Sequence, residues 1–208
     1  MDALVAEVVE RFGGLDVVVA NAGIAPEPGT ARVMDDAMFE RVIEVDLLGV
    51  WRTVRPALPQ IVQRQGHVVV VASVYAFVNG MGNAPYAMAK AGVEQLGRTL
   101  RAELSLHGAS ATTAYFGFID TEMVHQSLDR NPLKGKLMAV TPKPFHKRLP
   151  PSAAGEGIAR GIEKRAARVV LPKRWIPLSV LRGIVGPPAD AAMLRRADIQ
   201  DLMRALDG

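Results

Sequence analysis

The sequence contains no cysteine, and aromatic residues make up only 5% of its 208 positions. Without cysteine the chain forms no disulfide, zinc–thiolate site or cysteine nucleophile, and no metal site is predicted. No apolar run approaches the roughly 18 residues of a membrane-spanning helix. The first residues, Met1–Glu7, lack the basic and apolar regions of a secretory signal. These absences favour a cytoplasmic protein.

Charge is distributed unevenly along the chain. The formal net charge is +4, but residues 1–129 carry −6 and residues 130–208 carry +10. A basic C-terminal third suits either a solvated surface or an acidic partner such as an anionic membrane. Its basic residues surround the apolar stretch Trp175–Val185, and the alternative to membrane contact is that this segment covers the substrate site or contacts another subunit. No motif with interleaved aromatic residues accompanies the charge, so nucleic-acid binding is not predicted.

Helical patterns of apolar residues alternate with short valine-rich runs. They predict helices over Ala3–Phe12, Met38–Val62, Pro85–Leu106 and Ala189–Leu206, and strands over Leu15–Ala20, His67–Ala72, Ala111–Tyr115 and Arg168–Leu171. Pro56 is expected to bend or interrupt the second helix, and Ser152 to cap a further helix. Residues 121–151 are predicted to form a polar, proline-bearing loop region. This alternation is typical of α/β proteins with a parallel sheet, whose ligands bind beyond the carboxyl ends of the strands.

Candidate catalytic side chains follow the predicted strands. Tyr86 and Lys90 are four residues apart at the head of a helix, so they share one helix face. The lysine ammonium is expected to lower the phenol pKa from its ordinary value near 10, so that Tyr86 exchanges a proton with an alcohol or carbonyl. Ser73, at the mouth of the preceding strand, is placed to hold the substrate oxygen. A Tyr-x-x-x-Lys pair alone is common on helices, and only the position of each residue after a strand supports the hypothesis.

Three segments resemble the short-chain dehydrogenase/reductase family in sequence and spacing. Residues Gly14–Gly23 resemble the family's fourth strand with its Asn-Ala-Gly motif. Ser73, Tyr86 and Lys90 match the family's Ser, Tyr and Lys, and Phe116–Thr121 resembles its Pro-Gly-x-x-x-Thr segment. The resemblance implies a Rossmann-like parallel sheet with helices on both faces. It also implies an oxidoreductase that uses NAD or NADP to interconvert an alcohol and a ketone or aldehyde.

The resemblance assigns roles to individual residues. The catalytic candidates are Ser73, Tyr86, Lys90 and Asp46. The cofactor-binding candidates are Asn21, Ala22, Gly23, Tyr86, Lys90, Gly117, Ile119 and Thr121. The first three would line the adenosine and ribose side of the cofactor, although a strand-ending turn explains the same residues. Lys90 would hold the nicotinamide ribose, and the last two would hold the carboxamide.

Two positions depart from the family pattern. Asp46 stands where the family has an asparagine, which helps to hold a water that links the lysine to solvent. An ionised aspartate accepts a hydrogen bond from that water but donates none, and a purely structural role at a helix bend is the alternative. Phe116 stands where the family has proline, which changes the loop but leaves Gly117 and Thr121 in place.

The family's opening strand and glycine-rich turn have no counterpart in this sequence. That turn brings backbone N–H groups to the cofactor pyrophosphate, whereas the only Gly-x-Gly here, Gly80–Gly82, lies between Ser73 and Tyr86. The chain is therefore expected to be an N-terminally truncated member that lacks the first strands. An unpaired sheet edge at Val17–Ala20 is expected, together with only weak NAD(P) binding by these 208 residues.

The sequence predicts one incomplete Rossmann-type domain over residues 1–208, with a substrate loop region at 121–151 and a basic C-terminal extension at 173–208. The loop region carries apolar residues that suit a hydrophobic alcohol or ketone or ordinary packing: Phe118, Met123, Met138 and Phe145. A homodimer or homotetramer is implied, because the family pairs its two long helices between subunits. The alternative is a catalytically inactive short form that binds a protein partner through its exposed sheet edge.

Overall fold

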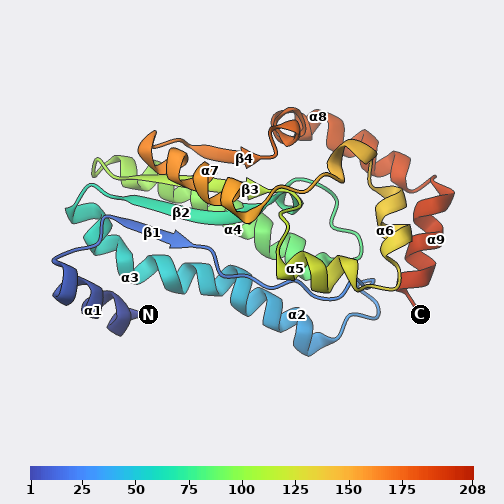
Figure 1. Ribbon diagram of the computed structural model, residues 1–208, viewed down its shortest axis with the longest axis horizontal. Coiled ribbons are helices and arrows are strands. Elements are labelled where there is room, and N and C mark those ends of the chain that lie inside the picture. Colours follow the sequence, from blue (N-terminus) through green and yellow to red (C-terminus); the bar gives the residue numbers. More distant parts are fainter.

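The computed structural model describes all 208 residues, Met1–Gly208, as an α/β structure around one parallel sheet (Figure 1). The strands run in the order β1-β2-β3-β4. The helices and strands are α1 (Asp2–Phe12), β1 (Val17–Ala20), α2 (Asp36–Ile43), α3 (Gly49–Gln63), β2 (His67–Ser73), α4 (Ala84–Ser105), β3 (Ser110–Phe116), α5 (Glu122–Val124), α6 (Lys134–Val140), α7 (Pro151–Glu163), β4 (Arg168–Leu171), α8 (Ile176–Met193) and α9 (Ala197–Leu206). The predicted fold class is confirmed.

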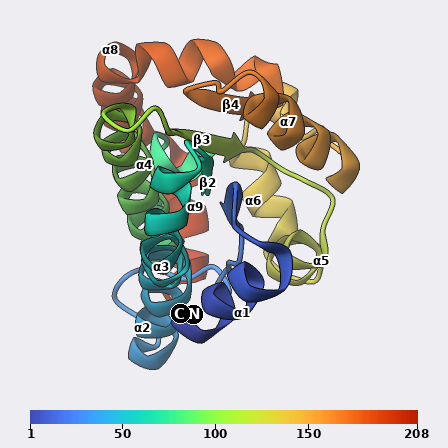
Figure 2. The same ribbon diagram turned by 90° about the vertical axis from the view of Figure 1, so that its left-hand side faces the viewer.

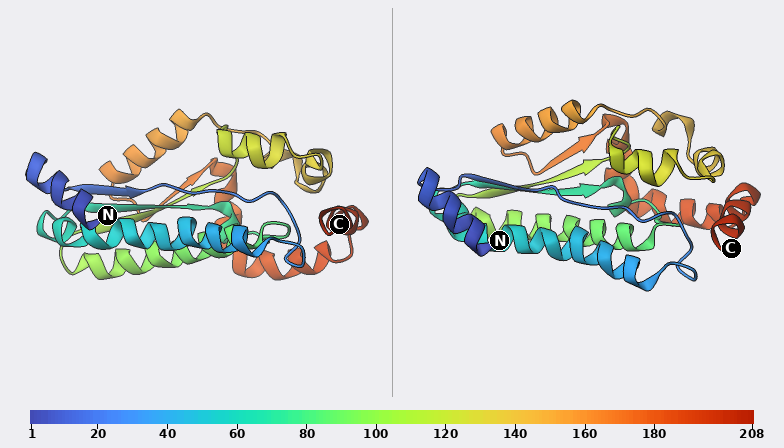
Figure 3. Two further views of the ribbon diagram at one scale, coloured as in Figure 1. Left: turned by 90° about the horizontal axis from the view of Figure 1, so that it is seen from below. Right: turned by 60° about the horizontal axis from the view of Figure 1, so that its bottom comes forward.

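Helices cover both faces of the sheet. Helices α3 and α4 pack on one face and α7 on the other (Figures 2 and 3). Both layers approach the strands closely through glycine. A Cβ on Gly97 of α4 would lie 2.6 Å from Val70 Cγ2, and one on Gly161 of α7 would lie 2.7 Å from Val169 Cγ2. Larger side chains there would push the helices off the sheet.

The core of the sheet is strand β2, in which every residue is buried. The register pairs His67 of β2 with Val17 on one side and Ser110 on the other. A continuous valine run is typical of a parallel strand covered on both faces. Strand β1, in contrast, pairs only with β2, and its Val19 is 39% exposed. The predicted unpaired edge is therefore present.

The helix predicted over Met38–Val62 is interrupted, but not at the predicted position. A π-helical turn at Glu44–Leu48 separates α2 from α3, whereas Pro56 lies inside α3 without ending it. Asp35 caps α2, because its carboxylate accepts a hydrogen bond from the Met38 N–H at 2.8 Å. The interruption thus falls at the family's asparagine position, which Asp46 occupies.

Three predictions for the C-terminal half are wrong. Residues 121–151 contain helices α5 and α6 and a π-helical turn at His125–Asp129, rather than only loop. Helix α7 begins one residue before Ser152, at Pro151, because a proline at the first helical position lacks only an N–H that would have no partner there; Pro150 stands at the cap position. The last predicted helix, Ala189–Leu206, is the two helices α8 and α9. Helix α8 starts at Ile176, and none of the helices is long and apolar enough to cross a bilayer.

The imidazole of His67 makes stability depend on pH. His67 is buried and contacts Ser110 Oγ at 2.6 Å and Thr112 Oγ1 at 2.8 Å. Burial, helped by the charges of Arg165 and Arg101, lowers the pKa of His67 to about 4. Between pH 6.5 and pH 4 the His67 imidazole binds a proton in the unfolded chain but stays neutral in the folded chain. The free energy of unfolding therefore falls as the pH falls.

We predict that acidification from pH 6.5 to pH 4 costs at most about 3 kcal/mol through His67, from 1.36 kcal/mol per pKa unit. The measurement is urea unfolding of the wild type and a His67→Gln variant across this range. The variant should lose less stability on acidification than the wild type. The matched control, His107→Gln, changes an exposed histidine, and its free energy of unfolding should depend on pH as that of the wild type does. Parallel curves for wild type and His67→Gln would contradict the prediction.

Candidate active site

The candidate residues gather at the carboxyl edge of the sheet. Residues 21–23 follow β1, Ser73 ends β2, and residues 117–121 follow β3. Tyr86 and Lys90 lie in the first turns of α4, which packs against the end of β2. The parallel strands therefore bring together side chains that are up to 100 residues apart, from Asn21 to Thr121.

Ser73 and Tyr86 lie close together at this edge of the sheet. The Ser73 hydroxyl donates to the Phe116 carbonyl at 3.3 Å and accepts from the Tyr75 N–H at 3.3 Å. The same hydroxyl lies within hydrogen-bonding reach of the Tyr86 phenol. The Tyr86 ring packs edge-on against Tyr75, with ring centroids 5.6 Å apart, which fixes the phenol beside Ser73.

A buried ion pair stands behind Tyr86. Lys90 Nζ lies 3.1 Å from Asp46 Oδ2, and the two side chains are 4% and 0% exposed. Lys90 also donates to the Val71 carbonyl at 3.3 Å, and its ammonium lies 5.3 Å from the centroid of the Tyr86 ring. The other carboxylate oxygen of Asp46 accepts from the Ile24 N–H at 2.7 Å. Such a pair is held in place by its hydrogen bonds as much as by charge.

The structure places the Asp46 carboxylate directly against Lys90, and its hydrogen bond to a water stays a prediction. The π-helical turn at Glu44–Leu48 carries Asp46, and Gly23 leaves room for the pair, because a Cβ there would lie 3.0 Å from Asp46 Oδ2 and 3.3 Å from Lys90 Nζ. The π-helical turn, which often marks a functional site, and the glycine together bring the carboxylate to the ammonium.

The Tyr86 pKa differs from the expectation of a lowered value. Burial raises the pKa of Tyr86 to about 12. The Ser73 hydrogen bond opposes that rise, and the Asp46 carboxylate adds to it. The four-residue spacing indicates the ammonium of Lys90, but it reveals neither the burial of the phenol nor the Asp46 carboxylate that offsets the ammonium's charge. Burial also raises the pKa of Asp46, against the opposing effects of Lys90 and the Ile24 N–H. In the chain by itself, Tyr86 is a neutral phenol at pH 7.

The cofactor-binding candidates occupy the same edge with different degrees of exposure. Asn21 and Ala22 are exposed, and Gly23 is half-buried against Asp46 and Lys90. Ile119 is buried and bridges to Leu149, which ties the loop after β3 to the start of α7. The Thr121 hydroxyl donates to the Ile119 carbonyl at 3.4 Å, a weak bond that a ligand can replace. Gly117 has a structural reason to be glycine, because a Cβ would overlap the Trp175 indole nitrogen.

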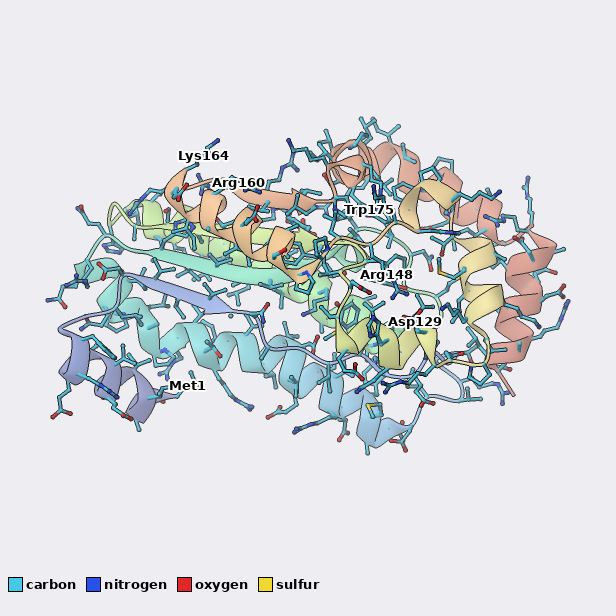
Figure 4. All side chains as sticks on the ribbon, in the orientation of Figure 1. Met1, Asp129, Arg148, Arg160, Lys164 and Trp175 are labelled. Carbon is cyan, nitrogen blue, oxygen red and sulfur yellow. The ribbon has the colours of Figure 1, made fainter.

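The structure shows two arginine pairs that the sequence analysis missed. Arg182 of α8 binds Glu94 of α4 through two parallel hydrogen bonds of 2.7 and 2.6 Å. Arg148 binds Asp129 through two bonds of 2.6 and 2.7 Å, and the two side chains adjoin beside α5 (Figure 4). The partners are 88 and 19 residues apart, so no local spacing marks them. These bidentate pairs fix α8 on α4 and the two ends of the 121–151 region on each other.

Trp175 was also missed as part of the site. Its indole is 7% exposed, stacks on Phe145 with ring centroids 4.0 Å apart, and its Nε1–H has no hydrogen-bond partner. The ring lies under the start of α8 (Figure 4). It contacts Gly117 in the loop after β3 and Phe145 in the 121–151 region. A tryptophan before an apolar helix gives no signal of such a contact in sequence.

Comparison with known proteins shows the family to which this fold belongs. A family model described as short chain dehydrogenase matches residues 1–132, well over half of the chain. The protein is therefore a member of the short-chain dehydrogenase/reductase family, as the sequence resemblance predicts.

Several relatives share this class. A 3-oxoacyl-[acyl-carrier-protein] reductase of Staphylococcus aureus is 35% identical over 141 residues, which cover 67% of this chain and 56% of the relative. An uncharacterized NAD-dependent oxidoreductase of Mycobacterium tuberculosis is 38% identical over 125 residues, 58% of this chain and 44% of the relative. A solved structure of a variant actinorhodin polyketide ketoreductase with NADPH is 28% identical, with a TM-score of 0.70 over 82% of this chain and 70% of that one. The chain spans about half the length of the curated relatives it matches.

We predict that the Asp46–Lys90 pair is needed for stability. Asp46→Leu leaves the Lys90 ammonium buried without its partner, which should lower the free energy of unfolding by about 3–5 kcal/mol. Asp46→Asn keeps an oxygen that accepts from the Ile24 N–H, so its free energy of unfolding should fall clearly less than that of Asp46→Leu. Urea unfolding measures both, with Asp36→Asn, an exposed acid of α2, as the control that changes little. Equal stability of the Leu and Asn variants would refute the assignment.

Proposed function

We propose that the protein is an NAD(P)-dependent oxidoreductase of the cytoplasm that interconverts an alcohol and a ketone or aldehyde. The observation that carries this proposal is the assembly of Ser73, Tyr86 and Lys90 at one edge of the sheet. A structural role explains each of these residues singly. It does not explain a half-buried phenol that lies near both a serine hydroxyl and a lysine ammonium at the ligand-binding end of the strands.

Tyr86 and Ser73 have different roles in the proton transfer. In reduction, Tyr86 gives its phenolic proton to the carbonyl oxygen of the substrate while a hydride adds to the carbonyl carbon. In oxidation the phenolate takes the alcohol proton as the hydride leaves. The Ser73 hydroxyl donates to the substrate oxygen and stabilises its developing negative charge. Because the pKa of Tyr86 is raised to about 12, the phenol is protonated at pH 7 and suited to the reductive direction.

The residues present fit the nicotinamide end of a dinucleotide cofactor, which supplies or accepts the hydride when bound. Lys90 has three N–H donors, of which one is given to the Val71 carbonyl and another can turn toward Asp46 Oδ2, 3.1 Å away. The third donor is left for a ribose hydroxyl. Thr121 and the backbone of Ile119 lie beyond β3, where a carboxamide would bind, and Asn21 and Ala22 offer an exposed turn beyond β1. The choice between NAD and NADP is not assigned to any of these residues.

The substrate class follows from the 121–151 region, which we assign to substrate binding. Its apolar candidates are all half-buried: Phe118, Met123, Met138 and Phe145. The Arg148 pair with Asp129 holds the region in place, and Phe145 is anchored on Trp175. An apolar wall that these contacts fix beyond the end of β3 suits a hydrophobic ketone or alcohol.

The protein is expected to form a homodimer or homotetramer through its long helices. Exposed apolar side chains on them support this: Trp51 of α3 is 42% exposed and Met88 of α4 is 56% exposed. The second candidate function is an inactive module that binds a partner along strand β1, supported by the exposed Val19 and the unpaired edge. The two functions differ in whether Tyr86 matters for turnover.

We predict that Tyr86→Phe in the native protein reduces turnover by about 10²–10⁴-fold, the usual contribution of general acid–base catalysis. Turnover is followed by nicotinamide absorbance with a panel of apolar ketones, and cofactor binding by NAD(P)H fluorescence. The variant should still bind cofactor, since only a hydroxyl is removed. The matched control is Tyr75→Phe, an adjacent tyrosine, which should keep turnover within a few-fold. Undiminished turnover in Tyr86→Phe would falsify the proposed function, and a native protein without turnover would favour the binding module.

A further inference from the structure

Helix α8 presents an apolar face to the outside of the molecule. Its most exposed large side chains recur every three to four residues, with exposed fractions of 39% for Ile176, 56% for Val180, 46% for Leu181 and 76% for Ile184. Pro187 and Pro188 continue the same face, and both are exposed. A surface helix normally turns such a stripe toward the core. In α8 the stripe points the other way.

Polar contacts on the opposite side of α8 fix this orientation. Arg182 is held by Glu94 through the bidentate pair with α4, and Asp190 accepts from the Asn79 side chain at 3.2 Å. Leu178 packs against the core cluster. These three residues lie on one side of the helix at a spacing of 3.6 residues per turn, so the apolar face cannot rotate inward without breaking them. No element covers the outer side of α8 (Figures 1 and 2).

Positive charge surrounds this apolar face. Lys173 and Arg174 precede α8 and Arg195 follows it, whereas the next residue, Arg196, is paired with Asp198 at 2.6 Å. Asp190 is the only acidic residue within the helix, and it is bound to Asn79. The surroundings therefore carry an excess of cations without a nearby excess of acids, which is complementary to a layer of anionic headgroups.

The dimensions of the face favour a membrane over a second protein. An 18-residue helix is about 27 Å long and about 10 Å wide, or roughly 270 Å² of flat surface. A stable protein interface needs about 800 Å² from each partner. A single helix with an apolar face and cations at its ends is suited to lie in the interfacial layer of a bilayer, where its apolar side chains enter the acyl boundary.

We propose that α8, with the basic residues at its two ends, docks the protein on the surface of an anionic membrane without crossing it. A hydrophobic substrate dissolved in that membrane would lie near the site, because α8 follows directly on Trp175, which adjoins Gly117 and Phe145. The docking itself does not depend on the proposed oxidoreductase activity.

Co-sedimentation with vesicles tests the proposal in the full chain. We expect binding to vesicles of phosphatidylcholine with phosphatidylglycerol, weaker binding at high salt, and little binding to phosphatidylcholine alone. Ile184→Glu should weaken binding by about tenfold or more, since it places a charge in the apolar face. The matched control, Leu106→Glu, alters an apolar side chain that is 85% exposed at the far end of α4 and should bind as the wild type.

A second pair of variants tests the charges. Lys173→Glu combined with Arg195→Glu changes two cations that form no ion pair within the chain, and it should weaken binding to anionic vesicles by about tenfold. Circular dichroism verifies that each variant is folded. No vesicle binding by the folded wild type overturns the proposal, as does equal binding by Ile184→Glu and Leu106→Glu. Self-association that Ile184→Glu abolishes, without vesicle binding, overturns it in favour of a second copy of the chain.

Discussion

The Asp46–Lys90 ion pair is the interaction on which the site depends. It connects the turn after β1, through Ile24, to the π-helical turn and to the head of α4, and it is buried on all sides. A buried charge pair is costly unless each partner keeps its hydrogen bonds, so the three segments are held in one arrangement. The same pair sets the electrostatic surroundings of Tyr86, because the carboxylate offsets part of the ammonium's charge. The Asp46–Lys90 pair therefore both holds the site together and influences the protonation of Tyr86.

The C-terminal half is organised by arginine. The guanidinium of Arg182 binds Glu94, and that of Arg148 binds Asp129, each through two parallel hydrogen bonds. Planar, bidentate pairs determine orientation as well as distance. One pair fixes the rotation of α8 on α4, and the other fixes the region beside the site. The basic C-terminal third is thus a scaffold as well as a charged surface, and only part of its charge is free for a partner.

Much of the fold was predictable, and the reasons are local. The valine run of β2 and the helical spacing of α4 identify their elements, and the Ser73, Tyr86 and Lys90 positions follow from strand ends and helix period. The π-helical turn at Asp46 was not predictable, because nothing in its apolar spacing differs from that of an α-helix. The pairs made by Arg182 and Trp175 join distant segments, so only tertiary structure reveals them. The prediction of a lowered pKa for Tyr86 was wrong for the same reason, because a four-residue spacing does not reveal the burial of the phenol.

The protonation state of Tyr86 tests the account most directly. Phenolate formation can be followed by ultraviolet absorbance as the pH rises, and the difference between the wild type and Tyr86→Phe isolates this one residue. The account predicts no phenolate from Tyr86 below pH 10, because burial and Asp46 raise its pKa to about 12, and an earlier titration in Asp46→Asn. A Tyr86 phenolate already formed near neutral pH in the wild type would contradict it.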